Sequence, residues 1–250
     1  MSQHKRGSSY HLLQWTRMYR TAFAKSLTEL INLPDVAVAI GDWWRPDCSL
    51  DGDFDPFEAR TETLPSDFLS KENKLSIKQW WLKHQQGANT PNWDFICSAN
   101  INDVKGLIVI EAKSHKNEAK CNGKLLKNNA SAKSIENHEH IRKAIEQVNQ
   151  YLSIKYNISI SIDSHYQLAN RIAYAWKFAS LGIPVILIYL GFLNDLEMQD
   201  VGVPFYDEND WKKFMHEYSR DILPTELFES ESEINCGLSY FRFLFRTKNI

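Results

Sequence analysis

The sequence is poor in the residues that would mark several protein classes. Among its 250 residues there are only four cysteines, ten glycines and eight prolines. The cysteines are scattered without a short CxxC spacing, which argues against a structural zinc site or a disulfide framework. Because 43% of the residues are hydrophobic and glycine and proline are scarce, a largely disordered chain is excluded. We therefore expect one reduced, globular domain over residues 1–250, located in the cytoplasm.

A long hydrophobic run is also missing. The longest apolar segment, residues 183–193, is interrupted by Pro184 and Gly191 and is too short to cross a bilayer. The N-terminus mixes polar and aromatic residues, so it does not resemble a secretory signal. These features predict a protein that has no membrane partner.

The chain has no excess of positive charge, since its formal net charge is −2. This balance argues against a protein that coats nucleic acid over its whole surface. The charges are unevenly distributed, however. The segment 113–133 holds six lysines and one acid, whereas 195–233 holds twelve acids and three lysines or arginines. The basic segment can attract phosphate, although a solvated lysine-rich loop explains its composition equally well.

Hydrophobic periodicity predicts alternating helices and strands. Apolar residues recur at helical spacing over residues 10–32, 77–86, 134–155, 165–180 and 211–219. β-branched and apolar runs predict strands at residues 36–40, 93–98, 106–111 and 185–190, with weaker patterns at 158–162 and 240–245. This order predicts an α/β fold in which an antiparallel hairpin is followed by a crossover helix and a further strand.

Two acids lie on the two strands of the predicted hairpin. If the turn is centred near Asn102–Asp103, the pairing places Asp94 opposite Glu111, with Cβ atoms about 5 Å apart. A slip of one residue would instead place the two carboxylates on opposite faces. Lys113 follows Glu111 by two residues and shares its face if the strand continues.

This group of residues is suited to metal-assisted chemistry. Two carboxylates that converge at a strand end repel each other unless a cation lies between them. Hard oxygen ligands of this kind favour Mg²⁺ or Mn²⁺, which can also accept a phosphate oxygen. A lysine on the same face can stabilise developing negative charge or assist an attacking water. The sequence E-x-K is common on protein surfaces, but here it ends an apolar strand, where a charged pair needs a reason.

These residues resemble the signature of the PD-(D/E)XK nuclease superfamily. Asp94 on the first hairpin strand and Glu111-Ala112-Lys113 at the end of the second correspond to it. The family core, which runs helix, three strands, helix, strand, agrees with the predicted order over about residues 21–193. The resemblance implies a restriction-endonuclease-like core with a mixed sheet flanked by helices. It also implies an insertion at about 114–162 and an acidic C-terminal extension at 194–250.

The resemblance also implies roles for individual residues. Asp94 and Glu111 would bind Mg²⁺ or Mn²⁺, and Lys113 would assist the attacking water. The sequence departs from the family at Pro91-Asn92, where an asparagine replaces the aspartate of the PD pair, and the acid comes two residues later. Glu29, on the first predicted helix, is a further candidate metal ligand, although an exposed helical acid is the favoured interpretation.

Candidate nucleic-acid contacts come from two segments. Four polar residues on the helix predicted at 165–180 share one face because they lie at spacings of three and four: Gln167, Asn170, Arg171 and Tyr174. Gln167 and Arg171 are the candidates for binding DNA, since arginine binds phosphate with two hydrogen bonds. A stripe of solvent-facing polar residues is the equally weighted alternative. Lys116 and Lys120 of the lysine-rich segment are the other candidates.

The sequence as a whole predicts a Mg²⁺-dependent nuclease that hydrolyses phosphodiester bonds in DNA. A homodimer is one assembly that such an enzyme could form. The alternative is a catalytically inactive DNA-binding or assembly protein on the same fold, and the substitution at Asn92 keeps it open. A glycosidase with two carboxylates is a third interpretation, but a lysine two residues after the acid fits a metal site better.

Overall fold

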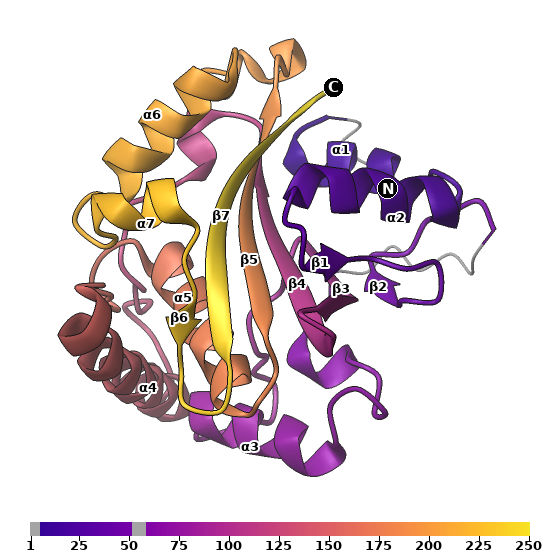
Figure 1. Ribbon diagram of the computed structural model, residues 1–250. Helices are drawn as coiled ribbons and strands as arrows, with labels where there is room; N and C mark the ends of the chain where they lie inside the picture. Colours follow the sequence, from indigo (N-terminus) through magenta and orange to yellow (C-terminus); the bar gives the residue numbers. More distant parts are fainter. Residues whose placement is uncertain (1–5, 52–58) are drawn as a thin grey trace.

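A mixed β-sheet of seven strands forms the centre of the protein (Figure 1). The computed structural model describes residues 6–51 and 59–250. The strands follow one another in the order β1-β3-β4-β5-β7-β6, and β2 pairs with β3. Their bounds are β1 (Val36–Ala37), β2 (Trp44–Arg45), β3 (Phe95–Ile101), β4 (Val104–Lys113), β5 (Val185–Leu193), β6 (Ile234–Asn235) and β7 (Tyr240–Asn249). The predicted α/β class is confirmed.

The hairpin of β3 and β4 has the register expected from the sequence. Phe95 pairs with Ile110, so Asp94, directly before β3, lies opposite Glu111 in the continued register. The turn residues Asn102 and Asp103 both have positive φ angles, of 53° and 60°. Asparagine and aspartate tolerate this conformation in tight hairpin turns, which fixes the register.

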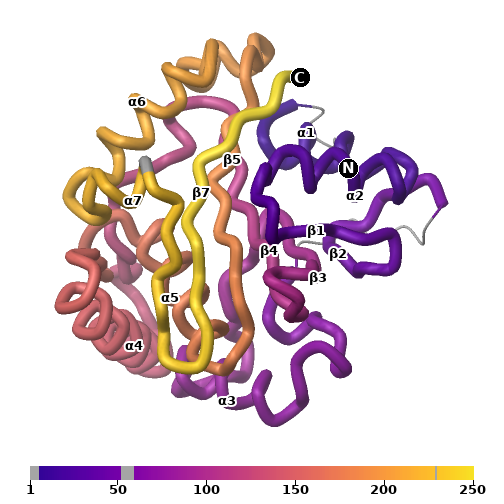
Figure 2. Tube along the Cα trace, viewed as in Figure 1, coloured from indigo at the N-terminus to yellow at the C-terminus, as the bar shows by residue number. Residues whose placement is uncertain are grey.

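β4 has an antiparallel neighbour on one side and a parallel neighbour on the other. It pairs with β3 through the hairpin and with β5 in parallel, where Glu111 lies beside Tyr189. β5 in turn pairs in parallel with β7 over the whole of both strands, as Figure 2 shows for the orange and yellow segments. The C-terminal ends of three parallel strands therefore meet at one end of the sheet, near Glu111.

Helices cover both faces of the sheet. α1 and α2 lie on one face, and α4 to α7 lie on the other (Figure 1). The helices are α1 (Ser8–Thr16), α2 (Arg20–Ile31), α3 (Lys71–Trp81), α4 (Ala132–Tyr156), α5 (Tyr166–Ser180), α6 (Glu208–Ser219) and α7 (Thr225–Ser230). Short 3-10 turns occur at Thr61–Thr63, Lys116–Glu118 and Leu196–Met198. Among the helices of the described ranges, none combines the length and apolar character needed to cross a bilayer.

The alternation of β4 decides which face carries the charged residues. Ile108, Ile110 and Ala112 pack with α1 and α2, whereas Leu107 and Val109 pack with the α4 and α5 layer. Because side chains alternate along a strand, Glu111 and Lys113 lie on the α5 side.

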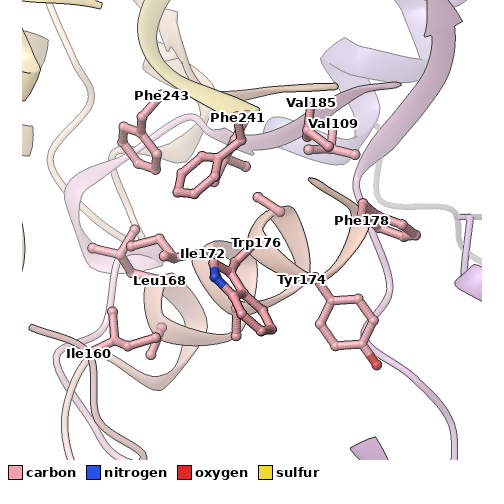
Figure 3. Packing of buried hydrophobic residues seen from close by; sticks show 14 of the residues in the cluster. Val109, Ile160, Leu168, Ile172, Tyr174, Trp176, Phe178, Val185, Phe241 and Phe243 are labelled. Carbon is pink, nitrogen blue, oxygen red and sulfur yellow. The ribbon is translucent and has the colours of Figure 1, made fainter. Parts of the chain in front are cut away.

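α5 is fixed against this face by its apolar side. Its Leu168 and Ile172 lie near Phe241 and Phe243 of β7 (Figure 3). All four are almost fully buried. Burial of each such side chain contributes roughly 1.5–3 kcal/mol to folding. Core packing therefore fixes the position of α5 relative to β4. The same packing orients the polar residues of α5 towards the end of β4.

Three sequence-based expectations about the elements were wrong. The helix expected over residues 10–32 is divided into α1 and α2. Arg20, which begins α2, pairs with Asp47 at 2.6 Å and stacks on Trp44, so contacts remote in sequence fix this start. The helix expected at 77–86 is α3, which begins at Lys71 and ends at Trp81. Residues 158–162 form no strand, since their isoleucines fill the core beneath α4 and α5.

Candidate active site

Three charged or polar side chains from two elements meet around the carboxylate of Glu111. Glu111 and Lys113 end β4, and Gln167 and Arg171 come from the first turns of α5. Lys113 Nζ donates a hydrogen bond of 2.5 Å to Glu111 Oε1, and Gln167 Nε2 donates to the same oxygen. Arg171 Nε donates to Glu111 Oε2 at 2.7 Å. Both oxygens of Glu111 are therefore engaged by cations or an amide.

These groups are buried as well as charged. The exposed fractions are 1% for Glu111, 4% for Lys113 and 7% for Arg171. Arg171 is held further by Asn170, whose Oδ1 accepts a hydrogen bond of 2.8 Å, and its guanidinium lies 4.8 Å from the ring centre of Trp93. A buried ion pair gains little net stability because desolvation offsets the attraction. Such a group is therefore a candidate for function.

Asp94 is the second carboxylate of the cluster. Its Oδ2 accepts a hydrogen bond of 2.8 Å from the backbone N–H of Ala112, the residue between Glu111 and Lys113. Within residues 6–51 and 59–250, no hydrogen bond to its other oxygen, Oδ1, is present. Asn92, at the position of the PD aspartate, accepts a hydrogen bond from Arg60.

The two carboxylates have opposite electrostatic environments. Desolvation, followed by repulsion from Glu111, raises the pKa of Asp94 to about 7. Desolvation also opposes the ionisation of Glu111, but Arg171 and Lys113 outweigh it and lower its pKa to about 2. Burial opposes the charge on Lys113 as well, yet Glu111 and Asp94 raise its pKa. Glu111 is thus ionised at neutral pH, whereas the ionised form of Asp94 would be stabilised by an additional cation nearby.

The donor set fits a hard divalent cation at Asp94 and Glu111. Across the described ranges, no group of three or more histidine, cysteine or acidic side chains is placed to hold a metal ion. Two carboxylates at one strand end are nevertheless a donor set that Mg²⁺ accepts, because this ion keeps several of its waters. Asp94 Oδ1 provides a position for it, and Glu111 would have to exchange one of its hydrogen bonds.

A hollow of about 480 Å³ lies over the cluster, and Asp94, Glu111, Lys113 and Gln167 all line it. Glu118, from the turn after β4, lines it too and was not singled out in the sequence. Its Oε2 accepts a hydrogen bond of 2.9 Å from the backbone N–H of Ser114. Its isolated position among lysines gave no periodic signal, so only the folded chain shows that a third acid faces this hollow.

The hollow adjoins a larger cleft of about 1030 Å³. Glu118, Lys120 and Gln167 line both spaces, so the cluster lies at one end of the cleft. The segment 88–92 forms one wall and the lysine-rich segment from Glu118 to Ala130 forms another. Residues of α5, among them Asn170 and Arg171, form part of its floor. Segments far apart in the sequence thus enclose a path that leads to Glu111.

The structure brings together most of the sequence-predicted residues but not all. Asp94, Glu111, Lys113, Gln167 and Arg171 meet, and Lys120 lines the adjoining cleft. The polar face of α5 is not a solvent-facing stripe, since Asn170, Arg171 and Tyr174 are buried. Tyr174 packs in an aromatic group with Trp81 and Trp93 rather than entering the site.

Two predicted residues lie elsewhere. Lys116 is bound to Asp210 at the start of α6, with 2.6 Å between Nζ and Oδ1. Glu29 lies on α2, its side chain is 66% exposed, and it lies 3.8 Å from Lys25. It lines a different hollow, between α2 and α6, which agrees with the favoured interpretation of an exposed helical acid. Spacing along one helix cannot show which face meets a distant strand end.

Known proteins give no independent identification of the site. No protein-family model matches the chain, and no curated protein or solved structure shows significant similarity to it. The chemistry of the site is therefore inferred from its residues and their geometry.

Proposed function

We propose that this protein is a metal-dependent nuclease that hydrolyses phosphodiester bonds in DNA. One observation carries the proposal: Glu111 is buried between Lys113 and Arg171, beside the carboxylate of Asp94, at the end of a cleft lined by lysines. Paired carboxylates with an adjacent lysine fit phosphodiester hydrolysis because the reaction needs a bound cation and stabilisation of negative charge. The cleft provides an electrostatic path for a polyanion.

The proposal includes membership of the PD-(D/E)XK nuclease superfamily, with its restriction-endonuclease-like core. The arrangement that supports it is the hairpin of β3 and β4, followed by α5 and by β5 in parallel with β4. In this assignment Asp94 takes the place of the first acid, and Glu111-Ala112-Lys113 that of the E-x-K sequence.

The residues of the site have distinct roles in the proposed reaction. Asp94 and Glu111 would hold Mg²⁺ or Mn²⁺, which would polarise the phosphate and favour ionisation of water. Lys113, as a buried ammonium, donates hydrogen bonds to the phosphate oxygens as negative charge develops on them. Arg171 and Gln167 orient Glu111, and Asn170 orients Arg171. The DNA backbone reaches the site along the cleft beside Lys120.

A second function has an observation in its favour. Both oxygens of Glu111 already accept hydrogen bonds from side chains, as they would in a purely structural ion network. A DNA-binding or assembly protein without turnover would keep this network and the basic cleft. It would bind DNA with no need for a divalent ion, and loss of the Glu111 charge would leave binding intact.

The deciding experiment is cleavage of plasmid and linear DNA with Mg²⁺ or Mn²⁺, compared with the same reactions in EDTA. Glu111→Gln and Lys113→Gln are the test variants, because glutamine removes the charge but keeps the size and hydrogen-bonding capacity that alanine would also remove. Lys105→Gln is the matched control, since Lys105 lies on the same strand at its far end. Cutting that requires metal, is lost in both test variants and survives in the control supports the nuclease. DNA binding without cutting under any metal supports the second function.

A further inference from the structure

We propose that the cleft of about 1030 Å³ binds a single strand of nucleic acid, so that the substrate reaches Glu111 as an unpaired strand or a frayed end. The inference rests on the proposed function for the identity of the reaction, but it concerns binding, which can be measured without turnover. Four features of the cleft carry it: its charge, the anchoring of its lysine-rich loop, its surfaces for bases and its size.

The charge of the lining is opposite to that of the whole chain. Five cations and one acid line the cleft, although the net charge of the protein is −2: Arg60, Lys120, Lys124, Lys127, Arg171 and Glu118. The three lysines of this set follow one another along a single loop. Cations spaced along one wall can follow consecutive phosphates of a strand, and this electrostatic contact needs no particular sequence.

The loop that carries these lysines is tied to the core. The backbone N–H of Lys124 donates to the carbonyl of Ile162 at 2.8 Å, and the carbonyl of Lys124 contacts His138 Nε2 at 2.8 Å. Gly123 permits the close approach, since a Cβ there would lie 2.4 Å from the carbonyl oxygen of Asp163. The backbone of the loop is therefore anchored at Lys124, in the middle of the lysine-rich segment.

The lining also provides surfaces for bases. Tyr166 lies on the floor, with its ring centre 4.8 Å from Lys124 Nζ, and an aromatic ring beside a cation is a platform on which a base can stack. Asn89 and Asn122 line the cleft, and amide groups match the hydrogen-bonding edges that bases expose when unpaired. Leu125, 84% exposed on the same loop, adds an apolar contact for base faces.

The size of the cleft favours one strand over two. The volume of the cleft, about 1030 Å³, is comparable with that of small-ligand pockets and matches a short stretch of one strand. Glu111 is buried in the hollow that adjoins this cleft, so a phosphate must enter a recess to reach it. An unpaired strand can bend into such a recess, whereas paired strands would have to separate first.

The test is fluorescence anisotropy in EDTA, where no cutting occurs, with a labelled single-stranded DNA 12-mer and the same sequence as a duplex. The test variant is the triple Lys120→Ala, Lys124→Ala, Lys127→Ala. The matched control is Lys25→Ala, Lys143→Ala, Lys213→Ala, which removes the same charge from α2, α4 and α6, away from the cleft. Because Lys124 packs on Tyr166, the double variant Lys120→Glu, Lys127→Glu serves as a second test if the triple variant is unfolded by circular dichroism.

We expect the single strand to bind at least about tenfold more tightly than the duplex at equal salt, and the cleft variants to lose about tenfold or more. The logarithmic salt dependence of binding should decrease by about 2 when three phosphate contacts are lost. The control should change affinity by less than about twofold. Equal or tighter binding of the duplex would overturn the inference, as would equal losses in cleft and control variants. Single-strand binding without cutting under any metal would refute the nuclease and leave this inference standing.

Discussion

Two buried carboxylates contact the β3–β4 hairpin at opposite ends, and their surroundings differ. Asp42 accepts hydrogen bonds from the backbone N–H of Ala39 at 2.7 Å, from Ser98 Oγ at 2.8 Å and from Lys105, whose side chain is more than half exposed. Within residues 6–51 and 59–250, no backbone N–H donates to the Glu111 carboxylate. Its partners are Lys113, Gln167 and Arg171, brought from β4 and from α5, more than 50 residues away.

The difference separates a structural carboxylate from a functional candidate. Asp42 closes a local turn, and its cation remains in contact with water. Glu111 is surrounded by buried side chains at the edge of a hollow, next to Asp94, which is costly to ionise. Burial alone therefore does not identify a functional carboxylate. The features that do are several charged partners, a neighbouring carboxylate and an adjacent cavity.

The largest expected difference in cleavage rate is between the variants Glu111→Gln and Asp42→Asn. Loss of the Glu111 charge should lower metal-dependent cleavage about 10³-fold or more, because that charge holds the cation and orients Lys113. Asp42→Asn should leave the cleavage rate of the folded protein within about threefold while lowering the free energy of unfolding by about 1–3 kcal/mol. Single-turnover cleavage and urea denaturation measure the two effects. A folded Glu111→Gln protein that cuts at the wild-type rate would contradict the comparison.

The next difference is between the two lysines of β4. Lys113→Gln should slow cleavage about 100-fold, since its ammonium lies where negative charge develops. Lys105→Gln should change the rate by less than about twofold, because Lys105 lies at the far end of β4 and pairs with Asp42 outside the site. Equal rate losses for the two variants would show that the distinction between the two ends is wrong.

Substitution of Gln167 tests whether the orientation of Glu111 contributes to the cleavage rate. Gln167→Ala should lower the rate about tenfold, because Glu111 loses a hydrogen bond but keeps both cations. Gln147→Ala, on α4, is the control: Gln147 bonds Trp80 outside the cluster and should have no effect on the rate. If both variants retain full activity, Lys113 and Arg171 alone hold Glu111.

The smallest expected effect concerns stability, and its sign differs between the two regions. The pKa of Asp94 is about 7 in the folded protein against 3.8 in an open chain, so the folded state retains the proton longer. Its contribution to stability is therefore lost as the pH rises from about 4 to about 7. Asp94→Asn in EDTA should be more stable than wild type at pH 8 by about 1 kcal/mol, with the difference absent near pH 3.

Asp42→Asn should be destabilising at pH 8. Thermal unfolding at the two pH values would reveal the opposite signs, and a destabilised Asp94→Asn protein at pH 8 would refute this account.

The sequence predicted local features well. The strand pattern and the turn residues placed Asp94 opposite Glu111, and the helical spacing of Gln167 and Arg171 placed both on one face. These predictions depend on short-range geometry, which a one-dimensional pattern contains.

Features that depend on tertiary contacts were not predictable. Lys116 resembles Lys120 in the sequence, yet only the folded chain shows Asp210 beside the former. The division between α1 and α2 depends on Asp47 and Trp44, and the position of Glu118 depends on a turn. Residues 158–162 have a strand-like pattern, but their backbone groups bond to α4 and to loops, such as Ile160 N–H to Asn149.

The parallel pairing of β5 with β7 has a consequence for how the protein is made. Residues 240–249 form β7, which pairs with β5 near one edge of the sheet, and Arg246 also donates to the carbonyl of Ile31 at the end of α2. A nascent chain on the ribosome therefore exposes the unpaired edge of β5, which is prone to aggregate, until residue 249 has been synthesised. The sheet that carries the cleft is therefore complete only after β7 has paired with β5.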